Sequence, residues 1–256
     1  IPVAVLKVDP KVTIGKLSNG FRYVIRPNSK PENRSELRLV VDVGSVLENE
    51  DQQGLAHFVE HMAFNGTENF HKQELVDYLE LVGMRFGPDL NAYTSFDETV
   101  YMLQIPMDST IVIDTAMQIL LDWAKGIKFE SKEIDKERGV VVEEWRLGRG
   151  ANRRMFDQQL PVLLRGSRYA DRLPIGQKAV LDTFSHETLR DFYETWYRPE
   201  LMGFVAVGQF ETSYMESLAI KYFSQIPVSD DGMDRKYHLV PNHDETLFAI
   251  ASDIEA

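Results

Sequence analysis

The chain has 256 residues, 43% hydrophobic and 27% charged, and no apolar run near the roughly 20 residues that cross a bilayer, so a globular protein without a membrane span is expected. Its 40 acidic and 28 basic side chains give a net charge of −12, which opposes nucleic-acid binding but also fits a merely solvated surface. With no cysteine, disulfides and thiolate chemistry are excluded, so any metal must be held by histidine and carboxylate side chains.

The first hundred residues mix strands with two helices. Helices are predicted over residues 54–64 and 72–82, the second ending at Gly83. Four segments have the β-branched residues and partial alternation of strands, namely residues 22–26, 36–43, 90–95 and 99–105.

From Asp108 the spacing becomes helical. Further helices are predicted over residues 108–126, 131–147, 153–164, 186–197 and 213–223, and further strands over residues 202–207 and 246–251. Strands and helices that are segregated along the chain indicate an α+β fold. The polar residues 229–234 are the only stretch typical of a linker.

A histidine and carboxylate motif lies in the helix predicted over residues 54–64. At about 100° per residue, His61 lies some 40° from His57 and Glu60 some 60° to the other side, so the three side chains share one face. Two imidazoles one turn apart can chelate a cation, and the carboxylate can act on water beside it. The remaining histidines are expected to be surface or capping residues, namely His71, His186, His238 and His243.

Such a metal site needs a third protein ligand, and the helix predicted over residues 131–147 offers two carboxylates. Glu137 and Glu144 fall about 20° from each other and inside the apolar stripe of that helix. Burial there is costly unless a cation, or alternatively a buried Arg or Lys, neutralises them. Because seven residues rise about 10 Å, only one of the two can bind the same ion, and helical geometry leaves open which one.

Several motifs together resemble a known peptidase family. They are GLAHFVEHMAFNGT at residues 54–67, NAYTS at 91–95, ERGVVVEE at 137–144, LPIG at 173–176 and YRP at 197–199. The chain resembles the inverted zincins, the family of pitrilysin, insulin-degrading enzyme and mitochondrial processing peptidase, over nearly its whole length. The segments FDETVY (96–101) and EEWR (143–146) are most similar to the bacterial envelope branch, which implies the periplasm or cell envelope, with the cytoplasm as the alternative.

The resemblance implies a zinc-dependent endopeptidase with one Zn²⁺ per chain. It assigns His57, His61 and Glu144 as zinc ligands, Glu60 as the general base and Glu137 as a supporting carboxylate. It also implies a mostly antiparallel sheet packed against several helices, as in a single domain of this family. Peptide substrates in the family add a β-strand at a sheet edge, which here implies substrate contacts at Asn91, Ala92, Tyr93, Thr94 and Ser95.

The resemblance further implies a second homologous domain or subunit that closes the chamber around the site. The start at Ile1 and the end at Ala256 suggest a piece of a longer protein, which alone is expected to be weakly active. We expect a catalytic domain over residues 1–228, followed by a connection and a last strand over residues 229–256. Two alternatives are a non-catalytic structural or substrate-binding member of the family, and a metal-dependent hydrolase acting on something other than peptides.

Overall fold

A single six-stranded sheet forms the centre of the fold in the computed structural model, which describes residues 7–72, 74, 77, 90–228 and 233–255. The strand order is β1-β2-β6-β3-β5-β4, and only the β2–β6 pair is parallel. The α+β class and the mostly antiparallel sheet are therefore confirmed. The strands are β1 (Thr13–Lys16), β2 (Arg22–Pro27), β3 (Arg34–Val41), β4 (Leu90–Thr94), β5 (Thr99–Pro106) and β6 (Met202–Gly208).

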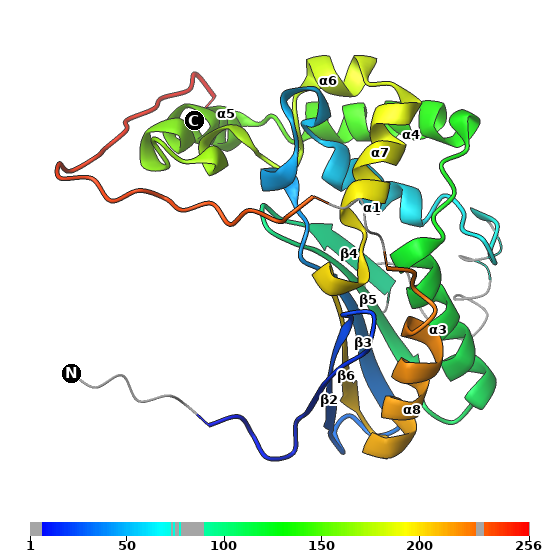
Figure 1. Cartoon of the computed structure of the whole chain (residues 1–256). Coiled ribbons are helices and arrows are strands. Elements are labelled where there is room, and N and C mark those ends of the chain that lie inside the picture. Colours follow the sequence, from blue (N-terminus) through cyan, green and yellow to red (C-terminus); the bar gives the residue numbers. More distant parts are fainter. Residues whose placement is uncertain (1–6, 73, 75–76, 78–89, 229–232, 256) are drawn as a thin grey trace.

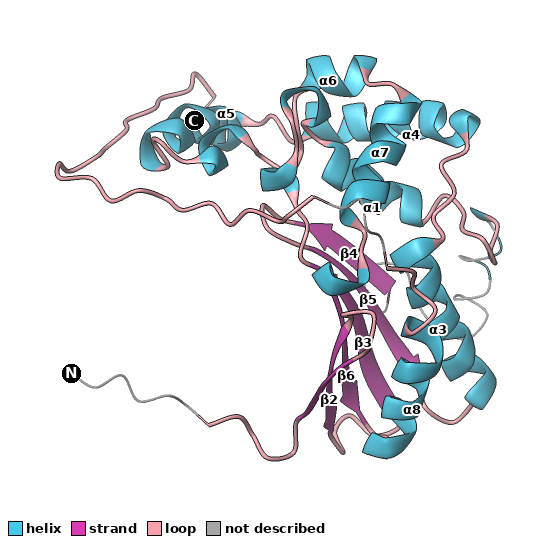
Figure 2. Cartoon of the chain, in the orientation of Figure 1, coloured by secondary structure: helices cyan, strands magenta, loops and turns pink. Residues whose placement is uncertain are grey.

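One face of the sheet packs against helices α3 (Thr110–Lys125) and α8 (Thr212–Phe223) (Figure 2). Alternate residues of the central strands supply the buried side, as Leu37 and Leu39 do in β3. This alternation is the period of two that places successive side chains on opposite faces. Within the described residues, Figure 2 shows no helix over the opposite face.

A second group of helices lies beyond one end of the sheet (Figure 1). Its central member is α1 (Leu55–Ala63), which contacts β4, β5 and two of its neighbours, α4 and α7. Phe58, Val59 and Met62 are fully buried on the inner side of α1, and its last carbonyl, at Ala63, accepts a 3.0 Å hydrogen bond from Trp123 Nε1. This anchoring leaves the opposite side of α1 facing a hollow. The other helices of the group are α4 (Ser131–Leu147), α6 (Lys178–Thr183) and α7 (His186–Trp196).

Helix α5 (Ala151–Leu163) lies to one side of this group, and the C-terminal segment runs along it (Figure 1). Arg154 Nη2 contacts the Asp253 carboxylate at 2.5 Å, and Arg165 Nη2 contacts Glu245 at 2.6 Å. None of the helices in the described part of the chain is long and apolar enough to cross a bilayer.

The strand predicted over residues 246–251 is wrong, because this segment is extended but joins no sheet among the described residues. It is a run of apolar residues, yet Phe248 and Ile250 are 77% and 91% exposed. An apolar run forms a strand only where a neighbour pairs with its backbone, and the C-terminal segment lies beside α5 instead, where Asp253 pairs with Arg154.

Most other predicted elements are confirmed, with ends that differ by two residues at most. Asp108 and Ser109 are both candidate N-caps by residue type, and the structure shows Ser109 as the cap of α3, with its hydroxyl accepting from Val112 N. Ser185 caps α7 in the same way, accepting from Thr188 N. Two short elements, β1 and α6, were not predicted because they span only four and six residues. The helix predicted over residues 72–82 falls largely outside the described residues.

Two glycines allow a close contact between the start of α1 and the loop of residues 173–177. Gly54 and Gly176 have φ angles of +105° and +75°, which L side chains rarely adopt. A Cβ atom at Gly176 would lie 2.4 Å from Gly54 Cα and 2.5 Å from the carbonyl oxygen of Gln53. The loop is therefore fixed against the helix by backbone contact.

We expect Gly176→Ala to lower the free energy of unfolding by about 2–4 kcal/mol, since it adds strain at positive φ to a clash with backbone atoms. Gly139→Ala is the control, because Gly139 lies inside α4 with nothing within 4 Å of its would-be Cβ, and it should stabilise by about 0.5–1 kcal/mol. Urea unfolding of both variants measures the difference, and equal stability of Gly176→Ala and the parent would contradict it.

Candidate metal centre

Three side chains from α1 and α4 bring metal-binding atoms together. His57 Nε2 and His61 Nε2 are 3.3 Å apart, and Glu144 Oε2 lies 3.3 Å from His61 Nε2 and 3.8 Å from His57 Nε2. The three atoms lie within 4.8 Å of one another, and this is the one such group among the residues that the structure describes. The helical spacing of the histidines and the packing of α4 on α1 together produce this convergence.

The donor set fits a zinc ion. Two ligand atoms at about 2.0–2.1 Å from a tetrahedral zinc are about 3.3–3.4 Å apart, close to the observed separations of His61 Nε2 from His57 Nε2 and from Glu144 Oε2. Two histidines and one carboxylate leave a fourth tetrahedral position free, as catalytic rather than structural zinc sites do.

The charges of the cluster also suit a cation. Burial and the neighbouring His61 lower the pKa of His57 to about 4, so this imidazole is neutral and able to act as a ligand at neutral pH. Burial alone would lower the pKa of His61, but hydrogen bonds to Glu137 and Glu144 outweigh it and raise the pKa to about 9. The hydrogen bond from His61 in turn lowers the pKa of Glu144. The two carboxylates thus favour positive charge between them.

Glu60 lies beside the three converging residues and lines the same hollow of about 550 Å³. Thr94 Oγ1, on β4, donates a 2.6 Å hydrogen bond to Glu60 Oε2. Burial raises the pKa of Glu60 above its ordinary value, against the opposing effect of this hydrogen bond. A carboxylate with a raised pKa in a hollow is suited to proton transfer.

Glu137 lies behind the histidines. Its Oε1 is 2.8 Å from His61 Nδ1, and its Oε2 accepts a 2.9 Å hydrogen bond from Asn65 Nδ2. Burial alone would raise the pKa of Glu137, but these hydrogen bonds lower it below its ordinary value. The carboxylate therefore fixes the His61 ring with Nε2 turned toward the cluster.

The structure corrects the expectation that both glutamates lie in a buried stripe. Glu137 is buried, but the Glu144 side chain is 51% exposed, because the C-terminal part of α4 extends past the core and leaves Leu147 exposed as well. Neutralisation by a buried base is not found: Lys72, half exposed, is 3.9 Å from Glu137, and no Lys or Arg of the described residues pairs with Glu144. Glu143, the neighbour of Glu144 in the chain, is exposed and pairs with Arg146.

The predicted substrate segment lies at an edge of the sheet. Within the described residues β4 pairs with β5 alone, and Ala92, Tyr93 and Thr94 line the hollow of the metal centre. Asn91 is exposed, and its Oδ1 accepts from the Ala92 N–H. Ser95 lies past the strand end, and both its backbone groups are engaged: its N–H donates to the Glu98 carbonyl, and its carbonyl accepts from the Ser45 N–H. In the described part of the chain, β4 itself is therefore the edge that can accept a further strand.

Sequence reasoning missed Glu48, a fully buried carboxylate at the start of α1. Its oxygens accept hydrogen bonds from the Gly54 N–H at 3.0 Å and the Ala56 N–H at 2.8 Å. Burial raises the pKa of Glu48 to about 8, although these hydrogen bonds oppose the rise. A carboxylate suits the positive end of a helix, but a carboxylate seven residues before the first residue of the helix carries no short-range sequence signal.

The chain is similar to curated proteins that are named as zinc proteases. "Zinc protease PQQL-like" of Arabidopsis thaliana is 41% identical over 243 residues, which cover 94% of this chain and 25% of that protein. "Probable zinc protease PqqL" of Escherichia coli (strain K12) is 38% identical over 232 residues, which cover 91% of this chain and 25% of that protein. The chain thus spans about a quarter of the length of these curated relatives.

A solved structure shows the same fold. The crystal structure of the first half of the periplasmic protease PqqL from Escherichia coli matches with a TM-score of 0.88 at 38% identity, covering 94% of this chain and 51% of that one.

Two family descriptions fit the chain. "Peptidase M16 inactive domain" fits residues 183–251. "Insulinase (Peptidase family M16)" fits residues 23–157, which are more than half of the chain and include the two helices of the metal centre. The chain therefore belongs to the insulinase family of peptidases, M16.

Proposed function

We propose that residues 1–228 are the catalytic domain of a zinc-dependent endopeptidase, with residues 229–256 as a connection. The observation that carries this proposal is the convergence of His57, His61 and Glu144 within 4.8 Å beside the carboxylate of Glu60. Both curated relatives are named as zinc proteases, which supports the choice of metal and reaction.

Each residue has a defined task in this proposal. His57, His61 and Glu144 hold the zinc ion, which when bound acts as a Lewis acid that makes water more acidic and polarises a carbonyl group. Glu60, with one oxygen held by Thr94, accepts a proton from the attacking water and delivers it to the leaving amine. Glu137 acts through His61, whose ring it orients.

The substrate is proposed to be a peptide or unfolded segment that adds a strand to the free edge of β4. Backbone hydrogen bonds at Ala92, Tyr93 and Thr94 would hold the peptide beside Glu60 whatever its side chains. The hollow is open on the side of the exposed Glu144 carboxylate, which favours a second domain or subunit that closes over it.

Two further proposals, on a second half of the protein and on its compartment, rest on a relative. The Escherichia coli structure is the first half of its protein, which supports a second half facing this domain and a weaker activity for this chain by itself. That protein is also described as periplasmic, and we propose the periplasm or cell envelope for this chain.

The test is hydrolysis of unfolded peptides by the zinc-loaded full-length gene product, with mass spectrometry of the products. Cleavage at internal bonds that stops on removal of zinc and returns on its addition is the expected result. Zinc binding without cleavage of any peptide would support the non-catalytic alternative instead.

The two glutamates of α4 should differ in their effect on the metal. Glu144→Gln should weaken zinc binding strongly because a neutral amide replaces a charged ligand. Glu137→Gln should lower activity or zinc affinity only about 10- to 100-fold, the usual cost of losing a partner behind a ligand. Competition with a chelator measures the zinc affinity of both variants. Glu143→Gln is the control, because Glu143 is exposed on the same helix, and it should bind zinc as the parent does. Stronger zinc loss in Glu137→Gln than in Glu144→Gln would exchange their roles.

A further inference from the structure

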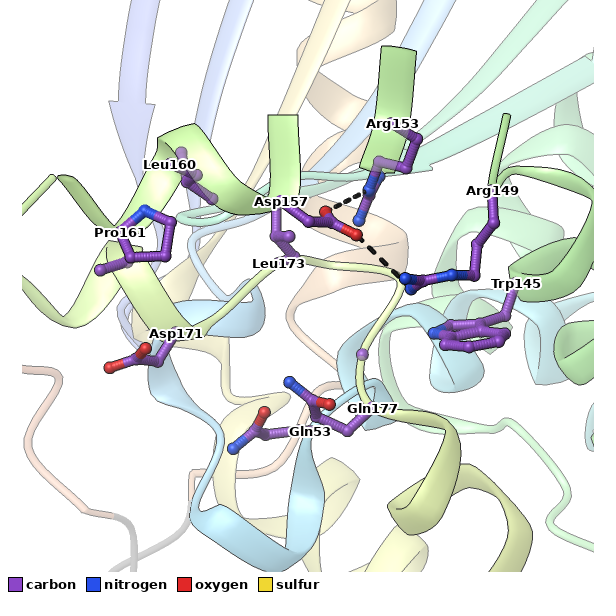
Figure 3. A pocket seen from close by; sticks show the side chains of 12 residues that line it. Gln53, Trp145, Arg149, Arg153, Asp157, Leu160, Pro161, Asp171, Leu173 and Gln177 are labelled. Carbon is purple, nitrogen blue, oxygen red and sulfur yellow. Dashed lines mark hydrogen bonds and ion pairs between the residues drawn. The ribbon is translucent and has the colours of Figure 1, made fainter. Parts of the chain in front are cut away.

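Figure 3 shows a second hollow, of about 230 Å³, which shares a lining residue with the hollow of the metal centre. Arg153, near the start of α5, lines both hollows. The loop of residues 173–177 separates them, with Pro174 and Ile175 on the side of the metal centre. The opposite side of this loop faces the second hollow through Leu173, Gly176 and Gln177. A peptide held at β4 would therefore have Arg153 within the space that surrounds its reacting bond.

At one end of the second hollow, two guanidinium groups share one carboxylate. The single carboxylate of Asp157 lies between two guanidinium groups, with Oδ1 2.7 Å from Arg153 Nε and Oδ2 3.4 Å from Arg149 Nη1 (Figure 3). Asp171 also lines the hollow, but it lies at the opposite end from both guanidinium groups (Figure 3). Arg149, Arg153 and Asp157 together thus carry one positive charge in excess, although Glu60 and Glu144 also line the hollow that Arg153 shares with the metal centre.

Among the described residues, the Arg153 side chain has one hydrogen-bond partner, Asp157. Asp157 engages only its Nε, and neither terminal NH₂ group forms a hydrogen bond within the described part of the chain. The Arg153 side chain is 31% exposed, so a ligand can reach it although the protein covers most of it. A guanidinium group binds a carboxylate through two parallel hydrogen bonds, and Asp157 already fixes its orientation from the other side.

We propose that Arg153 is a specificity residue that recognises an acidic side chain of the peptide near the scissile bond. The proposal rests on the proposed peptidase function and adds a substrate class to it. Although the net charge of −12 favours basic partners at long range, the nearest charges decide which side chain fits beside the metal centre.

Binding tests this proposal separately from hydrolysis. The zinc-loaded full-length gene product carrying Glu60→Gln is titrated with peptides that place Glu, Gln or Lys at each of six positions around one bond. Each peptide is made with a free and with an amidated C-terminus. At one position, the Glu peptide should bind about tenfold more tightly than the Gln peptide whichever C-terminus it carries.

Variants at Arg153 assign the effect. With Arg153→Gln the ratio between Glu and Gln peptides should fall to about one, and with Arg153→Glu the Lys peptide should bind best. Arg165→Gln is the control, since Arg165 pairs with Glu245 away from the hollow, and it should keep the parent's ratio. Circular dichroism checks that each variant is folded.

The proposal is overturned if Glu and Gln peptides bind equally at every position, if no peptide binds, or if only the free C-terminus matters. It is also overturned if Arg153→Gln keeps the tenfold ratio. If the protein with Glu60 intact hydrolyses no peptide but the Glu60→Gln variant still binds Glu peptides selectively, the proposed peptidase reaction is refuted and the recognition by Arg153 stands.

Discussion

Glu60→Gln should lower kcat for peptide hydrolysis by about 10²–10⁴-fold and leave zinc bound. The amide has nearly the shape of the carboxylate and can still accept the hydrogen bond from Thr94, but it cannot take a proton from water. The three proposed ligand side chains are untouched by the change. Steady-state kinetics on one unfolded peptide and metal analysis of the same preparation measure the two quantities together.

The control for this variant is Glu143→Gln, which also removes one carboxylate but lies on the solvent side of α4. It should keep both activity and zinc. Turnover of Glu60→Gln within a few-fold of the parent would exclude Glu60 as the base. Loss of zinc in Glu60→Gln would mean that Glu60 supports the metal as well.

His57→Ala should reduce zinc from about one ion per chain to background. It removes one of the three converging donor atoms, and the remaining His61 and Glu144 give an incomplete set for zinc. Metal analysis after dialysis against metal-free buffer measures the loss, with circular dichroism to confirm the fold. Activity should fall with the metal.

His186→Ala is the matched control. His186 is the first residue of α7 and pairs with Asp135 of α4, outside the metal-binding group. It should keep its zinc under the same dialysis. Stoichiometric zinc in His57→Ala would refute the proposed centre, whatever the activity of that variant.

The helices and most strands could be predicted from the sequence because their signals are local. The apolar residues of α1 repeat with the helical period, and this period alone places His57, Glu60 and His61 on one face. Ser109 and Ser185 mark the N-terminal ends of α3 and α7, because their hydroxyl groups cap the first turn. The failure at residues 246–251 has the same origin, since the pattern of a strand is local but its partner is not.

The surroundings of the proposed site depend on contacts across the fold and could not be predicted. Helical geometry could not rank Glu137 and Glu144, because only the position of α1 against α4 determines which carboxylate meets His61 Nε2 and which meets Nδ1. The hydrogen bond from the Thr94 hydroxyl to Glu60 could not be foreseen, because the two residues are 34 positions apart in the chain. Arg153 could not be singled out either, since nothing in the sequence of α5 marks which of its basic residues lines the hollow.

The two walls of the second hollow are attached to the molecule in different ways. The loop of residues 173–177 is fixed to α1 by the backbone contact at Gly54 and Gly176, so enlarging a side chain there would displace the helix that carries His57. Helix α5 has only Leu160 buried, and surface ion pairs such as Arg154–Asp253 hold it. An engineer who wishes to change which peptides are accepted should therefore substitute residues on α5, where new side chains can be introduced without moving the metal ligands.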